Sequence, residues 1–192
     1  MNVFFTVAYH GNQQFGKYYK LLYNEIKHLG YTHLDDEAIT TTSKDYIEKM
    51  SQGRSVQVAN YRNKMKNLQD ADICVVEASS HNLGGGYVIE KSLQLSKPTI
   101  VLYHKNNIPF FLTGIEDEKL VVISYNEDNY KKVLADSFAT AKEKRDKRFN
   151  FFISPELLDY LSQQSKLQGI TKSAFIRTLL KQHRKRAHKQ ED

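Results

Sequence analysis

Short apolar runs alternate with amphipathic stretches along residues 1–140. The runs NVFFTV, DICVVEA, PTIVLYH and KLVVISY have the length and the branched or aromatic content of buried strands. Between them, apolar residues recur at helical spacing, as at Tyr18, Leu22, Ile26 and Leu29, a stripe that ends at Gly30. Apolar strands separated by helices predict an α/β fold with a doubly wound, mainly parallel sheet, which is a Rossmann-like architecture.

A different pattern begins at the charged stretch AKEKRDKR, residues 141–148. A short apolar run, RFNFFI, is followed by two amphipathic stretches. Ser154 and Pro155 are typical of the start of the first helix, Gly169 of its end, and Thr171 of the start of the second helix. We therefore expect an α/β domain over residues 1–140, a charged linker or helix end over 141–147, a small strand–helix–helix module over 148–186 and a polar tail over 187–192.

The positive charge of the chain belongs to this last part. The net charge is +6, and residues 142–192 contain 13 lysine or arginine residues against 6 acidic ones. Such an asymmetry indicates a nearly neutral body with a basic module that favours nucleic acid. The single cysteine, Cys74, excludes a disulfide framework within the chain, and no apolar run is long enough to span a bilayer. With no signal-peptide pattern at the N-terminus, we expect a cytoplasmic protein without membrane contact.

The C-terminal module resembles the ribbon-helix-helix family of DNA-binding repressors and antitoxins, chiefly through GITKSAFIRTLL, residues 169–180. The resemblance implies a homodimer or higher homo-oligomer formed through residues 148–182, whose paired strands enter the major groove. A unit of this size cannot bury its large apolar residues alone, which agrees with a partner chain. DNA-binding candidates on the strand are Arg148, Asn150 and Phe152, although Phe152 stands where the family has a small polar residue. Thr171, Lys172 and Ser173 are candidate phosphate ligands at a helix start.

Three consecutive glycines stand in SSHNLGGGYVIEK, residues 79–91, directly before a predicted helix. Together with the strand DICVVEA and Lys97-Pro98, the motif Leu83-Gly84-x-Gly86-Tyr87 resembles the nucleoside 2-deoxyribosyltransferase-like family, which includes nucleotide N-glycosidases. The resemblance implies a nucleoside or nucleotide held at a helix N-terminus, where backbone N–H groups favour an anion. The implied nucleotide-binding residues are Tyr9, His10, Gly11, Asn82, Gly84, Gly85, Gly86 and Tyr87.

The catalytic residues of that family are replaced in this chain. Val88 stands at the position of the nucleophilic glutamate, and a second family acid falls on Lys64. A valine can neither attack nor stabilise an anomeric carbon. Two other acids are candidates for a catalytic role. Glu90 has the spacing of a glutamate in lysine-decarboxylase-like phosphoribohydrolases, and Glu77 follows a strand at the expected edge of the pocket.

The sequence thus predicts a DNA-binding regulator whose body senses a nucleotide and is catalytically impaired, with no cofactor and no metal site. One alternative is an active nucleoside or nucleotide N-glycosidase or 2-deoxyribosyltransferase that uses Glu77 or Glu90 and is oligomerised by its C-terminal module. A third hypothesis gives the body only a structural role and makes the module an antitoxin-like binder of a protein partner.

Overall fold

In a computed structural model, which describes residues 1–144 and 151–188, the chain divides into two units, Met1–Asp146 and Lys147–Asp192. The larger unit contains a five-stranded sheet in the order β2-β1-β3-β4-β5, and every neighbouring pair of strands is parallel. The strands are β1 (Asn2–Val7), β2 (Thr32–His33), β3 (Ile73–Glu77), β4 (Thr99–His104) and β5 (Leu120–Tyr125). The predicted doubly wound parallel sheet is confirmed.

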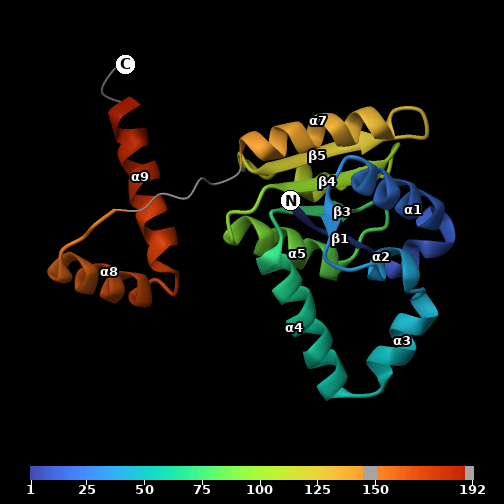
Figure 1. Ribbon diagram of the computed structural model, residues 1–192, viewed down its shortest axis with the longest axis horizontal. Coiled ribbons are helices and arrows are strands. Elements are labelled where there is room, and N and C mark those ends of the chain that lie inside the picture. Colours follow the sequence, from blue (N-terminus) through green and yellow to red (C-terminus); the bar gives the residue numbers. More distant parts are fainter. Residues whose placement is uncertain (145–150, 189–192) are drawn as a thin grey trace. The chain divides into compact units, whose positions relative to one another are not determined.

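Helices cover both faces of this sheet, as Figure 1 shows. Helices α1 (Asn12–His28) and α7 (Tyr130–Glu143) lie on one face, where Phe5, Val75 and Leu102 of the central strands point. Helices α4 (Arg54–Asp70) and α5 (Leu83–Gln94) cover the opposite face, where Phe4, Cys74 and Val76 point. Because neighbouring residues of one strand point to opposite faces, each apolar run supplies both cores at once.

Two short helices absent from the sequence-based prediction follow β2. They are α2 (Glu37–Thr40) and α3 (Ser43–Ser51). The Thr42 side chain accepts a hydrogen bond from the Asp45 N–H, and the Asp45 carboxylate accepts one from the Thr42 N–H, so a capping box starts α3. Helices α3 and α4 form a hairpin whose tip projects away from the sheet (Figure 1). This hairpin places Tyr46 and Lys64 beside the end of β1.

The strand order reverses direction at β1. The chain passes from β1 to β2 on one side and then returns to β3 on the other side. Ligands in open α/β sheets bind in the crevice at the carboxyl ends of the strands where this reversal occurs. The segment after β1 includes the 3-10 helix η1 (Tyr9–Gly11), and the glycine triplet follows β3. Both segments therefore meet at this edge of the sheet.

The smaller unit contains helices α8 (Pro155–Leu167) and α9 (Lys172–His188). As the sequence indicates, Ser154 caps α8, because its hydroxyl accepts from the Leu157 N–H, and the Thr171 hydroxyl accepts from the Ala174 N–H at the start of α9. Gly169 has φ +65°, the left-handed conformation typical of a helix end.

One prediction for this unit is not met. In the described part of the run RFNFFI, Phe151 to Ile153, no residue lies in a strand. A strand needs a neighbour for its N–H and C=O groups, and a single chain offers none at this place. Arg148 and Asn150 lie outside the described residues.

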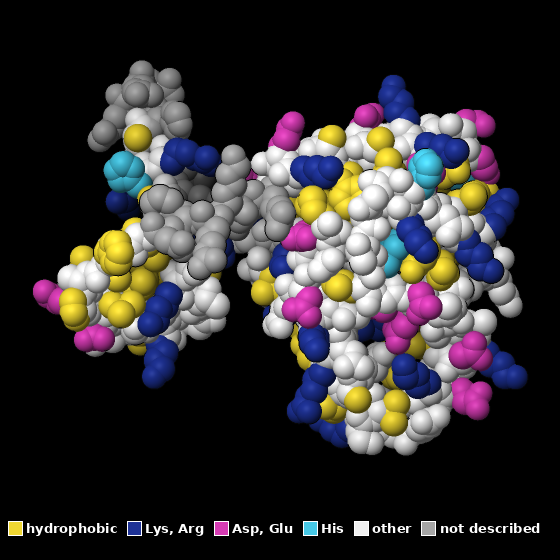
Figure 2. All heavy atoms as spheres, in the orientation of Figure 1, with side chains coloured by type: hydrophobic (Ala, Val, Ile, Leu, Met, Phe, Trp, Pro, Cys, Tyr) yellow, Lys and Arg dark blue, Asp and Glu magenta, His cyan; other side chains and the backbone are white. Residues whose placement is uncertain are grey.

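Large apolar side chains remain exposed on the smaller unit. Leu161 and Phe175 are buried, but most of the others are exposed, and Figure 2 shows hydrophobic side chains gathered over α8. The exposed residues are Phe151, Phe152, Leu157, Leu158, Tyr160, Leu167, Ile170, Leu179 and Leu180. In the part of the chain that the structure describes, no helix combines the length and apolar character that crossing a membrane requires.

The short remaining helix, α6 (Phe110–Thr113), lies between β4 and β5. It carries two further exposed aromatic residues, Phe110 and Phe111, which are 76% and 90% exposed. Helix α6 belongs to the edge of the sheet where the strands end, and it lines a cavity next to the start of α5.

Candidate functional site

A cavity of about 410 Å³ opens at the reversal point of the sheet. We call it the Lys64 cavity. Its wall includes the end of β1 and the residues that follow, Thr6 to His10, and the start of α5. The hairpin contributes Tyr46, Ile47 and Lys64. A volume in this range suits one small organic ligand.

Asn82 organises the start of α5. Its side-chain Oδ1 accepts a hydrogen bond from the Gly85 N–H at 2.7 Å, and its backbone carbonyl accepts from the Gly86 N–H at 3.3 Å. The preceding N–H groups, of Leu83 and Gly84, lack an acceptor within the helix by geometry. Gly84 and Gly85 line the cavity. The helix therefore presents unpaired donors and the positive end of its dipole to a ligand in this cavity.

Lys64 supplies a fixed cation at the same cavity. Its ammonium lies 2.8 Å from Glu37 Oε2 and 3.0 Å from the Tyr9 hydroxyl, and the Tyr9 hydroxyl in turn donates to Glu37 at 3.1 Å. The Lys64 side chain is 17% exposed. An ammonium group has three N–H donors. Because two of them are used within the cluster, the third is available to a ligand.

The pKa values in this cluster keep Lys64 and Glu37 charged. Burial alone would lower the pKa of Lys64, but Tyr9 and Glu37 raise it above its ordinary value. Burial raises the pKa of Glu37, and the hydrogen bond and charge of Lys64 outweigh this, so that it lies below its ordinary value. Burial raises the pKa of the Tyr9 hydroxyl to about 12, against the opposing effect of Lys64. Tyr9 is therefore neutral at pH 7.

Aromatic rings form one side of the cavity. The rings of Tyr9 and Tyr46 lie 4.6 Å apart between centroids and are tilted by 31°. Both residues line the Lys64 cavity and are half-buried, which leaves part of each ring open to the space. Flat aromatic surfaces beside a cation suit a ligand with an aromatic base and an anionic group.

Val88 faces this cavity, and Glu90 does not. Val88 is 6% exposed and lines the cavity from the second turn of α5. Glu90 is exposed, and its carboxylate accepts a hydrogen bond from Gln94 at 2.8 Å. Two residues along a helix correspond to a rotation of about 200°, so the two side chains point in nearly opposite directions. None of the residues that line the Lys64 cavity is an aspartate or a glutamate.

Glu77 is fully buried at the end of β3, next to the cavity wall but not part of it. Its Oε1 accepts hydrogen bonds from the Ser79 hydroxyl and, at 3.0 Å, from the Tyr125 hydroxyl. Its Oε2 has no hydrogen-bond partner. Burial raises the pKa of Glu77 to about 7, although the Ser79 and Tyr125 hydroxyls oppose this shift.

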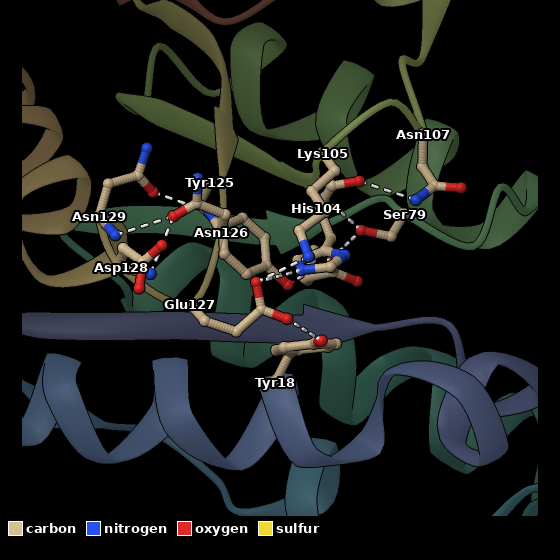
Figure 3. Close-up of polar contacts among 11 residues, drawn as sticks. Tyr18, Ser79, His104, Lys105, Asn107, Tyr125, Asn126, Glu127, Asp128 and Asn129 are labelled. Atoms are coloured by element: carbon tan, nitrogen blue, oxygen red, sulfur yellow. Dashed lines mark hydrogen bonds and ion pairs between the residues drawn. The ribbon is translucent and has the colours of Figure 1, made fainter.

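Polar residues continue from Glu77 to the surface (Figure 3). The Ser79 hydroxyl accepts from the His104 N–H at 2.6 Å, and the His104 ring stacks on Tyr18 with centroids 4.1 Å apart. Glu127 accepts a hydrogen bond from the Tyr18 hydroxyl and pairs with Lys105 at 2.9 Å. These two donors hold the pKa of Glu127 below its ordinary value. This cluster fixes the loops after β4 and β5 against α1.

Other predicted nucleotide-binding residues lie elsewhere. Tyr87 turns to α4, where its hydroxyl lies 2.9 Å from that of Tyr61, and Gly11 is buried. A Cβ at Gly11 would lie 2.4 Å from the Tyr19 hydroxyl, so this glycine permits close packing. Gly86 lines the neighbouring cavity. The structure brings together Tyr9, His10, Asn82, Gly84 and Gly85.

The candidate DNA-binding residues of the second unit are exposed where they are described. Phe152 is fully exposed, and Thr171, Lys172 and Ser173 lie on the surface at the start of α9. Helix α9 contains six lysine or arginine residues and no acidic residue in its sequence KSAFIRTLLKQHRKRAH. Its basic character distinguishes it from α8, which contains Glu156 and Asp159.

Two residues of the Lys64 site were not found from the sequence. Glu37 and Tyr46 belong to the short helices α2 and α3, whose sequences show no clear periodicity. Glu37 also lies 27 residues before its partner Lys64. Within residues 1–144 and 151–188, no three histidine, cysteine or acidic side chains gather as a group that could hold a metal ion.

Comparisons with known proteins give a match only among solved structures. No protein-family model and no curated protein matches the chain. Among solved structures, the chain is similar to the CMP N-glycosidase BcmB of Clostridium botulinum, with a TM-score of 0.48 and 15% sequence identity over 70% of this chain and 98% of that chain.

Proposed function

We propose that the protein is a DNA-binding regulator whose α/β body binds a nucleotide without cleaving it. The observation that carries this proposal is the lining of the Lys64 cavity, which combines a cation, a helix N-terminus and two aromatic rings with a valine where a glycosidase needs a carboxylate.

The phosphate or sugar of the nucleotide is held at the start of α5. The Gly84 N–H and the third N–H of Lys64, both from residues that line the cavity, would donate to the anion there. The existing Lys64–Glu37 ion pair does not prevent this contact, because it uses only one of the lysine donors. The base lies against Tyr9 and Tyr46, whose ring faces can stack on it.

Most glycosidases use a carboxylate at the anomeric carbon to cleave the glycosidic bond. Val88 stands at the cavity wall, Glu90 points away from it, and Glu77 is enclosed behind it. Glu37 belongs to the cluster, but its carboxylate is held in an ion pair with Lys64 and does not line the cavity. A bound nucleotide therefore remains intact and acts as a signal.

The second unit is proposed to dimerise and to bind DNA. Its exposed apolar side chains exceed those that its two helices bury, and a second copy would cover them. The basic α9 suits the DNA backbone. Nucleotide binding changes DNA affinity only if the two arrangements of the dimer bind the nucleotide with different affinity.

Calorimetry with the four deoxynucleoside 5′-monophosphates tests whether the α/β body binds a nucleotide. We expect at least one of them to bind the full-length protein and binding to weaken by at least about tenfold in Lys64→Met. Lys66→Met is the matched control, because Lys66 is an exposed lysine on the same helix. Absence of binding by all four nucleotides would refute the sensor.

Fluorescence anisotropy with the protein's own promoter DNA, over a salt series, tests whether the second unit binds DNA. The double variant Arg148→Ala, Asn150→Ala is expected to abolish sequence preference, while Arg62→Ala, Asn63→Ala on α4 removes the same residue types and leaves DNA binding unchanged. Weak binding that ignores both sequence and the double variant would assign the second unit to assembly alone.

A further inference from the structure

A second cavity, of about 320 Å³, adjoins the Lys64 cavity. We call it the Phe111 cavity. Its lining is mainly apolar and includes Ile89 of α5 and the segment from Pro109 to Leu112. Asn82 and Gly85 line both cavities. The two spaces therefore lie on either side of the first turn of α5.

Two phenyl rings stand open at the Phe111 cavity. Phe110 and Phe111 are 76% and 90% exposed, although each has an aromatic ring that most proteins bury in part. They follow one another on the single turn of α6, where the described structure places no other aromatic ring against them. An aromatic ligand would recover the area that both rings leave in contact with water.

Space is kept free at the boundary with this cavity. A Cβ built at Gly86 meets no atom within 4 Å, whereas at Gly84 and Gly85 it would approach Asn82 closely. An alanine at position 86 would favour the helix. Gly86 thus leaves space at the cavity, and packing of the free protein does not require a glycine there.

We propose that the two cavities together bind one dinucleotide-type ligand, with its linking phosphate at the start of α5, one nucleoside in the Lys64 cavity and the other against Phe110 and Phe111. This inference rests on the proposed function, since it assumes that a nucleotide occupies the Lys64 cavity. Each cavity has the size of a site for one small organic group. The start of α5, with Asn82 and Gly85, lies where the two cavities adjoin, and Lys64 lines the first of them, so the anionic link of such a ligand would stand at this helix N-terminus.

The chemistry of the two sides explains why a single mononucleotide leaves the site half filled. The Lys64 cavity offers hydroxyl, ammonium and backbone donors, while the Phe111 cavity offers chiefly phenyl and aliphatic surface. A mononucleotide with its base against Tyr9 and Tyr46 has no second group for the phenylalanines. A second base joined through a phosphate reaches them without a separate loss of translational freedom.

The test compares adenosine 5′-monophosphate with two dinucleotides, adenylyl-(3′→5′)-adenosine and diadenosine diphosphate, by calorimetry on the full-length protein. At least one dinucleotide is expected to bind at least about tenfold tighter than the mononucleotide. In Phe110→Ser, Phe111→Ser this gain is lost and the mononucleotide affinity is unchanged. Both rings are exposed, so we expect this variant to fold. Leu21→Ser is the control, since Leu21 is an exposed apolar residue of α1 that lines neither cavity.

The outcomes separate this inference from the proposed function. If the mononucleotide binds and neither dinucleotide binds more tightly, the inference is overturned and the sensor stands. If neither dinucleotide binds and the four deoxynucleoside 5′-monophosphates also fail to bind, both the inference and the proposed function are overturned. If the double serine variant changes the oligomeric state by sedimentation and leaves the dinucleotide gain intact, the phenylalanines form a contact between chains and the inference is again overturned.

Discussion

The ammonium of Lys64 lies 2.8 Å from the carboxylate of Glu37, and the hydroxyl of Tyr9 closes the triangle between them. The three side chains come from α4, α2 and the segment after β1, so the cluster ties the projecting hairpin to the sheet. It also fixes the position of the cation at the cavity.

The Lys64–Glu37 pair should contribute to stability as well as to binding. A double-mutant cycle with Lys64→Met and Glu37→Gln, measured by urea unfolding, is expected to give a coupling free energy of about 1 kcal/mol, since both groups are only partly exposed. The Lys66→Met, Glu37→Gln cycle should give none, because Lys66 is exposed and Glu37 pairs with Lys64 and Lys49 instead. Equal coupling in both cycles would contradict a specific pair.

Asn82 allows the stability of α5 to be separated from ligand binding. Asn82→Asp keeps an oxygen that can accept from the Gly85 N–H, so the free energy of unfolding should stay equal or rise. The new negative charge lies at the cavity and should weaken nucleotide binding by at least about tenfold. Asn82→Ala should lose about 1 kcal/mol of stability. Calorimetry and urea unfolding together distinguish the two effects, and an aspartate variant that binds normally would place the anion elsewhere.

Two glycines should respond in opposite directions to alanine. At Gly11, the new Cβ would lie 2.4 Å from the Tyr19 hydroxyl and 2.6 Å from Ser80 Cβ, so we expect a loss of about 1–3 kcal/mol. At Gly86 the Cβ meets nothing, and Gly86→Ala should raise the free energy of unfolding by about 1 kcal/mol. Thermal unfolding measures both, and a destabilised Gly86→Ala would show that this glycine serves the fold.

Glu77 should make the protein less stable as the pH rises. Its pKa is raised by burial from an ordinary value of 4.5 to about 7 in the folded state. The folded protein therefore binds more protons than the unfolded chain between these values, and stability falls from pH 4.5 to pH 7 by about 3 kcal/mol. In Glu77→Gln this contribution is absent.

The measurement is urea unfolding of both proteins at several pH values from 5 to 8. We expect the difference in unfolding free energy, variant minus original, to increase with pH. Other groups that titrate in this range, such as His33 with its pKa lowered chiefly by burial, cancel in this difference. A difference that stays constant with pH would show that Glu77 is ionised throughout.

The sequence was sufficient for four of the five strands, because each of these four carries its own signal, whereas the two-residue strand β2 was not predicted. The runs that become β1, β3, β4 and β5 are apolar on both faces, which only a covered parallel sheet explains. Val88 and Glu90 could be assigned to opposite sides of α5 from helical rotation alone.

The remainder of the site depends on contacts between distant residues. Glu37 has no partner within its own four-residue helix, and its role appears only when α4 brings Lys64 to it. Tyr87 directly follows the glycines, where a nucleotide-binding residue is expected, but its hydroxyl forms a hydrogen bond with Tyr61 on α4. The Phe111 cavity likewise forms only because residues of α6 and α5 line the same space, and no local sequence pattern predicts this arrangement.

The central place of β1 in the sheet has a consequence for synthesis. Its neighbour β3 is made much later, as the contact between Asn2 and Asp72, 70 residues apart, makes clear. At about 5–20 residues per second, the run VFFTV waits several seconds on the ribosome before it can be paired. During that time its unpaired edge is the part of the nascent chain most prone to aggregate, and the part for which a chaperone would have most use.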